Sequence, residues 1–290
     1  MKFSEFFQRS SPIVLDGAMG TLLESRGYYL PPPVWSAAVV EQSPETITEI
    51  HREYINAGAR IITTATFRTT AYVYARLGDA DKAGRLTEQA VNCAREARDD
   101  REDLFIAGSV APLEDCYRPD LVPDSETLYR EHRKRIRQLT DAGVDCLLIE
   151  TMNNVREAVM CAEIAEESGM PFIVSFICES AKSILSGEHV DAGRDAVAKY
   201  HPHAVLVNCT SPGVIRDILA RWHKKGNIPC GGYANVGSSE PRQGGIISSV
   251  LSPEEYLHKV RQWMEYQPSL IGACCGSGPE HIRAISELTE

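Results

Sequence analysis

The chain has 290 residues, 43% of them apolar and 24% charged, an ordinary balance for a globular protein with a large core. Its formal net charge is −10 and it contains no block of lysines or arginines, which argues against nucleic acid and anionic membrane surfaces as partners. The first residues lack the apolar run of a signal peptide, and no apolar stretch is long enough to span a membrane. We therefore expect a cytoplasmic protein, monomeric or homo-oligomeric.

Nine cysteines are scattered along the chain. A disulfide framework is typical of short secreted chains that are dense in cysteine, so these nine are expected to be free thiols. Six of them occur where cysteine serves as a small packing or loop residue: Cys93, Cys116, Cys146, Cys161, Cys178 and Cys230.

Short apolar runs alternate with longer amphipathic segments from one end of the chain to the other. Apart from Asp145, runs such as 145–149 and 204–207 are continuously apolar, which is typical of strands covered on both faces. Eight strands are predicted, over residues 13–15, 60–65, 104–109, 145–150, 172–177, 203–208, 228–232 and 269–272.

Helices are predicted between these strands. Ser43-Pro44-Glu45 supplies a cap and a first-turn proline ahead of apolar residues at helical spacing. Ser252 and Glu255 form a capping box, with Leu257, Val260 and Met264 as the expected buried stripe. Segments 82–100 and 153–168 complete two further crossovers. Eight strands with helical connections predict a single-domain (β/α)₈ TIM barrel over residues 1–290, of class α/β, rather than an open doubly wound sheet.

Two segments are predicted to be loops. Residues 28–37 include three consecutive prolines, and residues 231–249 are rich in glycine and serine. Both follow strands, so in a barrel they either stand over the functional face or are plain surface irregularities.

A barrel of this kind carries its chemistry at the carboxyl ends of its strands. Polar and sulfur-bearing residues gather at the predicted strand ends: Asp16-Gly17, 63–66, Glu150-Thr151, Asn208-Cys209, 233–235 and Cys274-Cys275. Such a concentration of polar and sulfur-bearing residues at the strand ends is expected of a functional site.

Three of these residues, Cys209, Cys274 and Cys275, are candidate metal ligands. Adjacent side chains of an extended segment point to opposite sides, so Cys274 and Cys275 can face one ion only where the chain turns, and Gly272 and Gly276 supply that freedom. A helix start follows each site, and the positive end of a helix, together with a metal, favours thiolate.

Three thiolates without a fourth ligand leave one position of a tetrahedral ion open, as in catalytic sites, and soft sulfur ligands favour zinc. Such a site already carries a net charge of about −1, so it suits a fourth thiolate from a substrate. Two other interpretations remain open from the residues alone: buried packing cysteines and a redox-active pair.

Two carboxylates stand at other strand ends. Glu150 could bind the ammonium group of an amino acid or pair with a neighbouring arginine or lysine. The Asp16-Gly17 turn could orient ligand-binding amides or cap the next segment. The glycine runs near 231–245 lack the spacing of a dinucleotide or P-loop motif, so no nucleotide site is inferred.

The chain also resembles a known family through motifs that occur in order along nearly its whole length: Leu15-Asp16-Gly17-Ala18-Met19-Gly20-Thr21, Ala57-Gly58-Ala59, Ile61-Ile62-Thr63-Thr64-Ala65-Thr66-Phe67, Ala107-Gly108-Ser109-Val110-Ala111-Pro112, Glu150-Thr151, Val207-Asn208-Cys209 and Gly272-Ala273-Cys274-Cys275-Gly276. It resembles the homocysteine S-methyltransferases, a zinc-dependent barrel family that includes betaine–homocysteine methyltransferase and the homocysteine-binding module of cobalamin-dependent methionine synthase.

The resemblance implies that Cys209, Cys274 and Cys275 hold one zinc ion per chain. It implies that Asp16 and Glu150, with the Gly17 turn, bind the amino-acid end of homocysteine. The implied reaction is transfer of a methyl group from a small donor to the homocysteine thiol, giving methionine.

Two departures from the family pattern bear on the methyl donor and on the turn. Ala273 replaces the glycine usual before the cysteine pair, and the segment from Tyr233 to Ser269 is shorter than in the betaine-using branch. The Arg68-Thr69-Thr70 context is closer to the S-methylmethionine-using branch, so S-methylmethionine or S-adenosylmethionine is the favoured donor. Aromatic residues of the first long loop, Tyr28, Tyr29 and Trp35, could cage a methylated cation or simply pack.

Two alternatives belong to other classes. The chain could be a homocysteine-binding module that presents the thiol to a partner with a methylated cofactor. A metal-free lyase or aldolase would need a Schiff-base lysine or a carboxylate set at the strand ends, and the sequence places neither there.

Overall fold

The computed structural model describes residues 3–7, 11–226, 228–237 and 250–289. Eight strands form one sheet, and every neighbouring pair is parallel. Their bounds are β1 Ile13–Val14, β2 Ile61–Thr63, β3 Phe105–Val110, β4 Cys146–Met152, β5 Phe172–Ile177, β6 Ala204–Asn208, β7 Cys230–Ala234 and β8 Leu270–Ala273.

The sheet closes on itself. Its order runs β1-β8-β7-β6-β5-β4-β3-β2, and a parallel bridge between Leu15 and Ile61 joins the two outermost strands. The Arg60 N–H donates to the Val14 carbonyl at 2.8 Å across the same seam. The predicted (β/α)₈ barrel is therefore confirmed.

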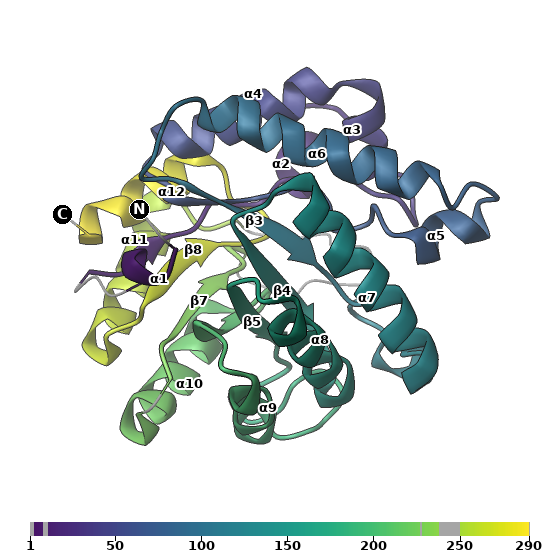
Figure 1. Ribbon diagram of the computed structural model, residues 1–290. Coiled ribbons are helices and arrows are strands. Elements are labelled where there is room, and N and C mark those ends of the chain that lie inside the picture. The colour runs from purple at the N-terminus through teal and green to yellow at the C-terminus, as the bar shows by residue number, and fades with distance from the viewer. Residues whose placement is uncertain (1–2, 8–10, 227, 238–249, 290) are drawn as a thin grey trace.

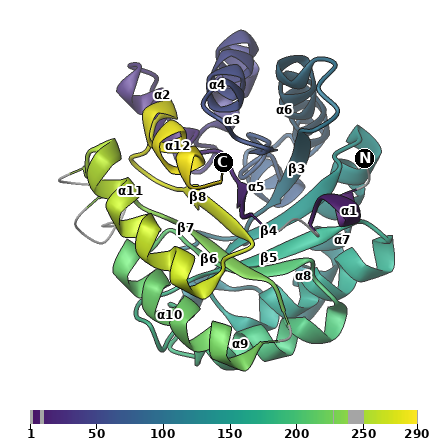
Figure 2. The ribbon, with the colours of Figure 1, turned by 90° about the vertical axis from the view of Figure 1, so that its left-hand side faces the viewer.

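Helices surround the sheet in both ribbon views (Figures 1 and 2). The α-helices are α1 Phe3–Phe6, α2 Gly20–Ser25, α3 Ala37–Gln42, α4 Pro44–Asn56, α5 Ala71–Arg76, α6 Lys82–Arg98, α7 Ser125–Ala142, α8 Val155–Ser168, α9 Val190–Val197, α10 Pro212–Lys225, α11 Pro253–Arg261 and α12 Pro279–Ser286. Short 3₁₀ turns are η1 Pro119–Leu121, η2 Ala198–Tyr200, η3 Gln262–Tyr266 and η4 Glu287–Thr289. No helix of the described segments is long and apolar enough to cross a membrane.

The predicted helix starts are largely confirmed. Helix α4 begins at Pro44, although Ser43 makes no side-chain cap bond, and α11 begins with the expected capping box of Ser252 and Glu255. The buried stripe of this last segment was wrong in part. Tyr256, Val260 and Trp263 form the buried stripe at helical spacing, whereas Leu257 and Met264 lie beside this stripe and are only half-buried.

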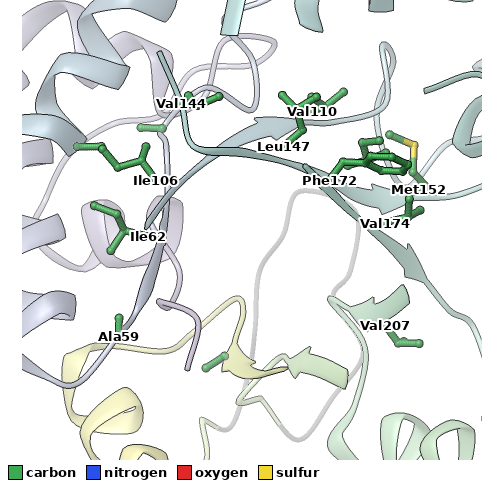
Figure 3. Packing of buried hydrophobic residues seen from close by; sticks show 14 of the residues in the cluster. Ala59, Ile62, Ile106, Val110, Val144, Leu147, Met152, Phe172, Val174 and Val207 are labelled. Atoms are coloured by element: carbon green, nitrogen blue, oxygen red, sulfur yellow. The ribbon is translucent and has the colours of Figure 1, made fainter. Parts of the chain in front are cut away.

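Alternation along the strands separates two apolar layers. One set of strand residues points outward against the helices and includes Ile62, Ile106, Leu147, Val174 and Val207 (Figure 3). The other set fills the barrel interior: Ile13, Leu15, Ile61, Phe105, Ala107, Cys146, Leu148, Ile173, Ala204, Leu206, Tyr233 and Leu270. The barrel is therefore a packed core with no pore through it, and its functional groups must lie above this filling.

Two strands extend two residues beyond their predicted ends. Strand β4 continues through Glu150 to Met152, and β7 runs from Cys230 to Ala234 rather than ending at residue 232. The first four residues of the predicted loop 231–249 are therefore strand, and residues 238–249 lie outside the described segments. The other predicted loop, 28–37, consists of turns that lead into α3.

Candidate metal centre

Three cysteine sulfurs meet at the carboxyl ends of β6 and β8. Cys209 directly follows β6, and Cys274 and Cys275 directly follow β8. Their Sγ atoms all lie within 4.8 Å of one another, with 2.6 Å between Cys209 and Cys274 and 4.0 Å between Cys274 and Cys275. The cluster predicted from strand-end placement is thus assembled in the structure, at the end of the barrel where chemistry is expected.

A tight turn brings the two adjacent cysteines to one side. The Ser277 N–H donates to the Cys274 carbonyl at 3.1 Å, and Gly276 has a φ of 85°. A positive φ at the third residue of such a turn favours glycine. The other flanking glycine has a different role from the predicted one. Gly272 has no positive φ, but a Cβ there would lie 2.8 Å from the Leu15 Cβ, so it serves close packing.

Strand β7 joins the two cysteine-bearing loops. Asn235 accepts a hydrogen bond from the Cys275 N–H at 3.2 Å and donates its own N–H to the Thr210 carbonyl at 3.0 Å. Its side chain is 1% exposed, and its Nδ2 has no hydrogen-bond partner among the described residues. A buried donor without a partner beside the thiols indicates that the site is built to receive a further group.

The helix starts predicted behind the cysteines are both present. Ser211 caps α10 by accepting from the Val214 N–H, and α12 begins at Pro279. The three thiols also act on one another. Hydrogen bonds from Cys209 and Cys274 hold the pKa of Cys275 well below its ordinary value. This arrangement favours one thiolate in the cluster before any ligand arrives.

The first candidate carboxylate, Asp16, follows β1 and is buried. Thr63 of β2 donates to it twice, from the backbone N–H at 2.7 Å and from Oγ1 at 2.9 Å. Burial nevertheless raises the pKa of Asp16 to about 8. Beside it, Gly17 allows a close approach of chain segments, because a Cβ there would lie 2.7 Å from the Tyr54 ring and 2.8 Å from the Ser277 hydroxyl.

The second candidate carboxylate, Glu150, points into the upper end of the barrel. It accepts hydrogen bonds from the hydroxyls of Ser109 on β3 and Tyr233 on β7. Burial raises its pKa to about 7, against the effect of these two bonds. The described contacts of Glu150 include no arginine or lysine, so the salt-bridge interpretation is not supported for this residue.

Glu150 and Asn208 were predicted to lie at the functional rim, but the polar layer to which they belong was not predicted from the sequence. Ser109, Glu150, Ser175 and Asn208 occupy the inward-pointing positions of four consecutive strands, and Tyr233 stands on the next. They form a polar layer directly above the apolar filling of the barrel. Every second residue of a strand points into the barrel, and this alternation could have identified the layer. The sequence alone does not say which of the two alternating sets points inward.

One further residue comes from the loop after β3. Burial raises the pKa of Tyr117 above its ordinary value, and the nearby Cys209 and Cys275 raise it further. The loop is anchored by Arg68, which donates to the Pro112 and Glu114 carbonyls, and by Glu157, which accepts from the Leu113 N–H. A fixed loop with a tyrosine near the thiols forms one wall of the site.

The six cysteines predicted to be packing or loop residues are all buried free thiols. Among the described residues, the three thiols above make up the only group of three or more potential ligands that converges in this way.

Comparison with known proteins places the chain in a family. Residues 13–289 match the family model described as homocysteine S-methyltransferase. YbgG, a homocysteine S-methyltransferase of Bacillus subtilis, is 32% identical over 94% of this chain and 93% of its own. A selenocysteine methyltransferase of Astragalus bisulcatus is 31% identical over 97% of this chain and 93% of its own. The metallated form of the homocysteine methyltransferase MmuM from Escherichia coli has a TM-score of 0.84 and 29% identity, covering 98% of both chains. The chain therefore belongs to the homocysteine S-methyltransferase family.

Proposed function

We propose that this protein transfers a methyl group from a small sulfonium donor to the thiol of homocysteine, giving methionine, and that Cys209, Cys274 and Cys275 hold one zinc ion for the reaction. The observation that carries the proposal is the convergence of three thiols beside two buried carboxylates at the carboxyl end of the barrel. A thiol-bearing amino acid has the two groups that such a site complements, a sulfur and an ammonium.

The donor set fits zinc. Sulfur is a soft ligand that zinc accepts and that magnesium and manganese disfavour. Zinc–sulfur bonds of about 2.3 Å in tetrahedral geometry place neighbouring sulfurs about 3.8 Å apart, close to the 4.0 Å between Cys274 and Cys275. Cys209 and Cys274 lie closer together, so these two sulfurs would separate on metal binding. Zinc, when bound, would stabilise the homocysteine sulfur as a thiolate near neutral pH.

The carboxylates of Asp16 and Glu150 would hold the ammonium group of homocysteine. Burial alone favours their protonated forms, with pKa values of about 8 and about 7. An ammonium group beside them favours the ionised forms, so substrate binding would release the protons that the carboxyl groups carry.

The transfer itself requires little acid–base chemistry from the protein. A sulfur–carbon bond forms between the homocysteine thiolate and the methyl carbon, and the bond from that carbon to the donor sulfonium breaks. The bonding electrons remain on the donor sulfur, which becomes a neutral thioether. The protein's part is to hold the two sulfurs in line with the methyl group and to exclude water.

Sulfonium donors are favoured for an electrostatic reason. With zinc bound, the three thiolates would leave the centre with a net charge of about −1, which attracts a cationic donor, and S-methylmethionine and S-adenosylmethionine carry a positive charge. The proposed aromatic cage of the first loop is not formed by its three members. The Tyr28 hydroxyl bonds to α4, Tyr29 is 81% exposed, and Trp35 stacks on Phe67 beneath the guanidinium of Arg68.

The test is a parallel assay of methionine formation from homocysteine with S-methylmethionine, S-adenosylmethionine, betaine and methyltetrahydrofolate. Zinc per chain is measured on the same preparations. We expect turnover with a sulfonium donor, one zinc per chain, and loss of both in the Cys209→Ser variant. Cys161→Ser, which changes a buried cysteine of α8, is the matched control and should retain both.

Two outcomes would count against the proposal. Absence of zinc from active protein would overturn the metal assignment. Tight zinc-dependent binding of homocysteine without turnover of any free donor would favour the alternative, a module that presents the thiol to a partner protein. Selenocysteine, the acceptor named for the Astragalus relative, is a useful competing acceptor in the same assay.

A further inference from the structure

Asn208 joins three strands at the base of the site. It is the last residue of β6, stands next to Cys209 and is fully buried. Its Oδ1 accepts from the Thr151 N–H at 3.1 Å and from the Ser175 hydroxyl at 2.6 Å, and its Nδ2 donates to the Thr151 hydroxyl at 2.8 Å. One amide side chain therefore ties β6 to β5 and β4 at the level of Glu150.

The backbone of β4 is irregular at this point. Its pairing with β5 shifts register between Ile149 and Met152, so Glu150 and Thr151 form a bulge. Thr151 has a φ of 59°, which is rare for a β-branched residue and persists only where the surrounding structure enforces it. The Asn208 side chain accepts a hydrogen bond from the N–H of this strained residue and donates one to its hydroxyl.

The other end of the link is also strained. Cys209 has a φ of 51° and donates its N–H to the Tyr233 carbonyl at 3.3 Å. Asn208 thus lies between two residues in the left-handed region, one next to Glu150 and one that is itself a candidate ligand. Bulges next to functional sites re-aim side chains, and a one-residue slip of a strand moves its side chains to the other face.

We propose that Asn208 is a positioning residue whose side-chain amide fixes the Glu150–Thr151 bulge. In this position the Glu150 carboxylate can bind the ammonium group of the same homocysteine molecule whose sulfur lies at the Cys209 end of the site. The inference rests on the proposed function, because it assumes that these two groups bind opposite ends of one substrate. The amide oxygen and nitrogen of Asn208 are engaged by Thr151 and Ser175. Its effect is on the relative placement of the two ends of the site.

The experiment measures homocysteine binding to the zinc-loaded protein in the absence of donor, by isothermal titration calorimetry, together with zinc per chain and the midpoint of thermal unfolding. Asn208→Ala removes the whole link. Thr151→Val keeps the side-chain shape but removes the hydroxyl, and Thr151→Ser keeps the hydroxyl. Leu219→Ala, in the buried face of α10, lowers stability without touching the link.

We expect Asn208→Ala to raise the dissociation constant for homocysteine at least tenfold, Thr151→Val to raise it severalfold, and Thr151→Ser to leave it within about twofold. Leu219→Ala should lower the unfolding midpoint and leave the dissociation constant unchanged. Thr151→Val and Thr151→Ser decide the question if Asn208→Ala does not fold.

Measurements on the wild-type protein distinguish failure of the proposed function from failure of the Asn208 assignment alone. Failure of wild-type protein to bind zinc or homocysteine would overturn the proposed function and this inference with it. Wild-type binding together with unchanged binding in Asn208→Ala, or in Thr151→Val if Asn208→Ala does not fold, would overturn the inference alone. Equal weakening by Leu219→Ala would also overturn it, because general destabilisation would then explain the effect.

Discussion

Thr63 holds the Asp16 carboxylate with two hydrogen bonds, one from its backbone N–H and one from its hydroxyl. These bonds oppose the effect of burial, which raises the pKa of Asp16 to about 8. The hydroxyl bond is the part that a substitution can remove, because the backbone N–H remains in any variant. Thr63 therefore adjusts how readily Asp16 is ionised when a substrate ammonium group arrives.

Thr63→Val should weaken homocysteine binding. The valine keeps the β-branched shape in β2 but removes one donor to a charged acceptor, a bond worth about 1.5–3 kcal/mol. We expect the KM for homocysteine at neutral pH to rise about tenfold, with a smaller change in kcat, in steady-state assays. Thr48→Val, which removes a buried hydroxyl bond in α4 instead, should leave KM unchanged. An unaltered KM in Thr63→Val would exclude Asp16 from the ammonium site.

The metal-free protein should lose stability through its carboxyl groups as the pH rises. Burial raises the pKa of Asp16 from 3.8 to about 8 and that of Glu150 from 4.5 to about 7. The folded state therefore keeps protons that the unfolded chain has released, and its free energy of unfolding falls as pH rises through this range. The slope is at most about 1.4 kcal/mol per pH unit for each group.

Urea unfolding between pH 6.5 and 8 measures this effect. In that window we expect Asp16→Asn to remove most of the carboxyl contribution and Glu150→Gln to act only in its lower part, so the wild-type curve should fall relative to both variants. The window lies above the region in which His51 contributes, since burial lowers its pKa to about 4. Parallel pH curves for wild type and Asp16→Asn would contradict the assignment.

Gly276 and Gly169 form a matched pair for testing the cysteine turn. Both have positive φ, 85° at Gly276 in the turn and 71° at Gly169 after α8. Alanine at either position should cost about 1–2 kcal/mol of stability. Only Gly276→Ala should also weaken zinc binding, measured by chelator competition, because only that turn orients Cys275. Equal zinc affinity in the two variants would show that the backbone conformation at Gly276 is not needed to orient Cys275 for zinc.

The barrel and the three thiols could be predicted from sequence for related reasons. Parallel strands buried on both faces are continuously apolar, so each one is recognisable, and the residue just after it lies on the functional rim. Cys209 and the Cys274-Cys275 pair stand immediately after such runs. Strand ends were less predictable. The apolar run of β4 stops at Glu150, yet the strand continues through a bulge that side-chain character does not reveal.

The polar layer inside the barrel could not be read from the sequence in the same way. Ser109 and Ser175 are single polar residues within otherwise apolar strands, and Asn208 is the last residue of another. Their function as a layer depends on which way each strand faces and on the register between neighbours. The contacts among these residues, Glu150 and Tyr233 connect positions 33–83 residues apart, so only the folded barrel brings them together.

Arg135 of α7 provides the last prediction, since it binds the backbone beneath the rim. Its guanidinium is buried and donates to the carbonyls of Thr66 and Thr69 in the loop after β2 and of Ser109 in β3, and to the hydroxyl of Thr87 in α6. Burial lowers its pKa to about 9, so the group remains charged at neutral pH. The positive charge is thus shared among carbonyl dipoles at a place where parallel strands end.

Arg135→Met should destabilise the protein by about 3 kcal/mol or more in urea unfolding, because it leaves buried carbonyls without donors. Arg135→Lys should recover part of the loss, since an ammonium group restores the charge but cannot reach both strand ends. Arg137→Met, on the exposed side of the same helix, should change stability by less than about 0.5 kcal/mol. A loss in Arg135→Met no larger than in Arg137→Met would mean that water replaces the guanidinium at these carbonyls.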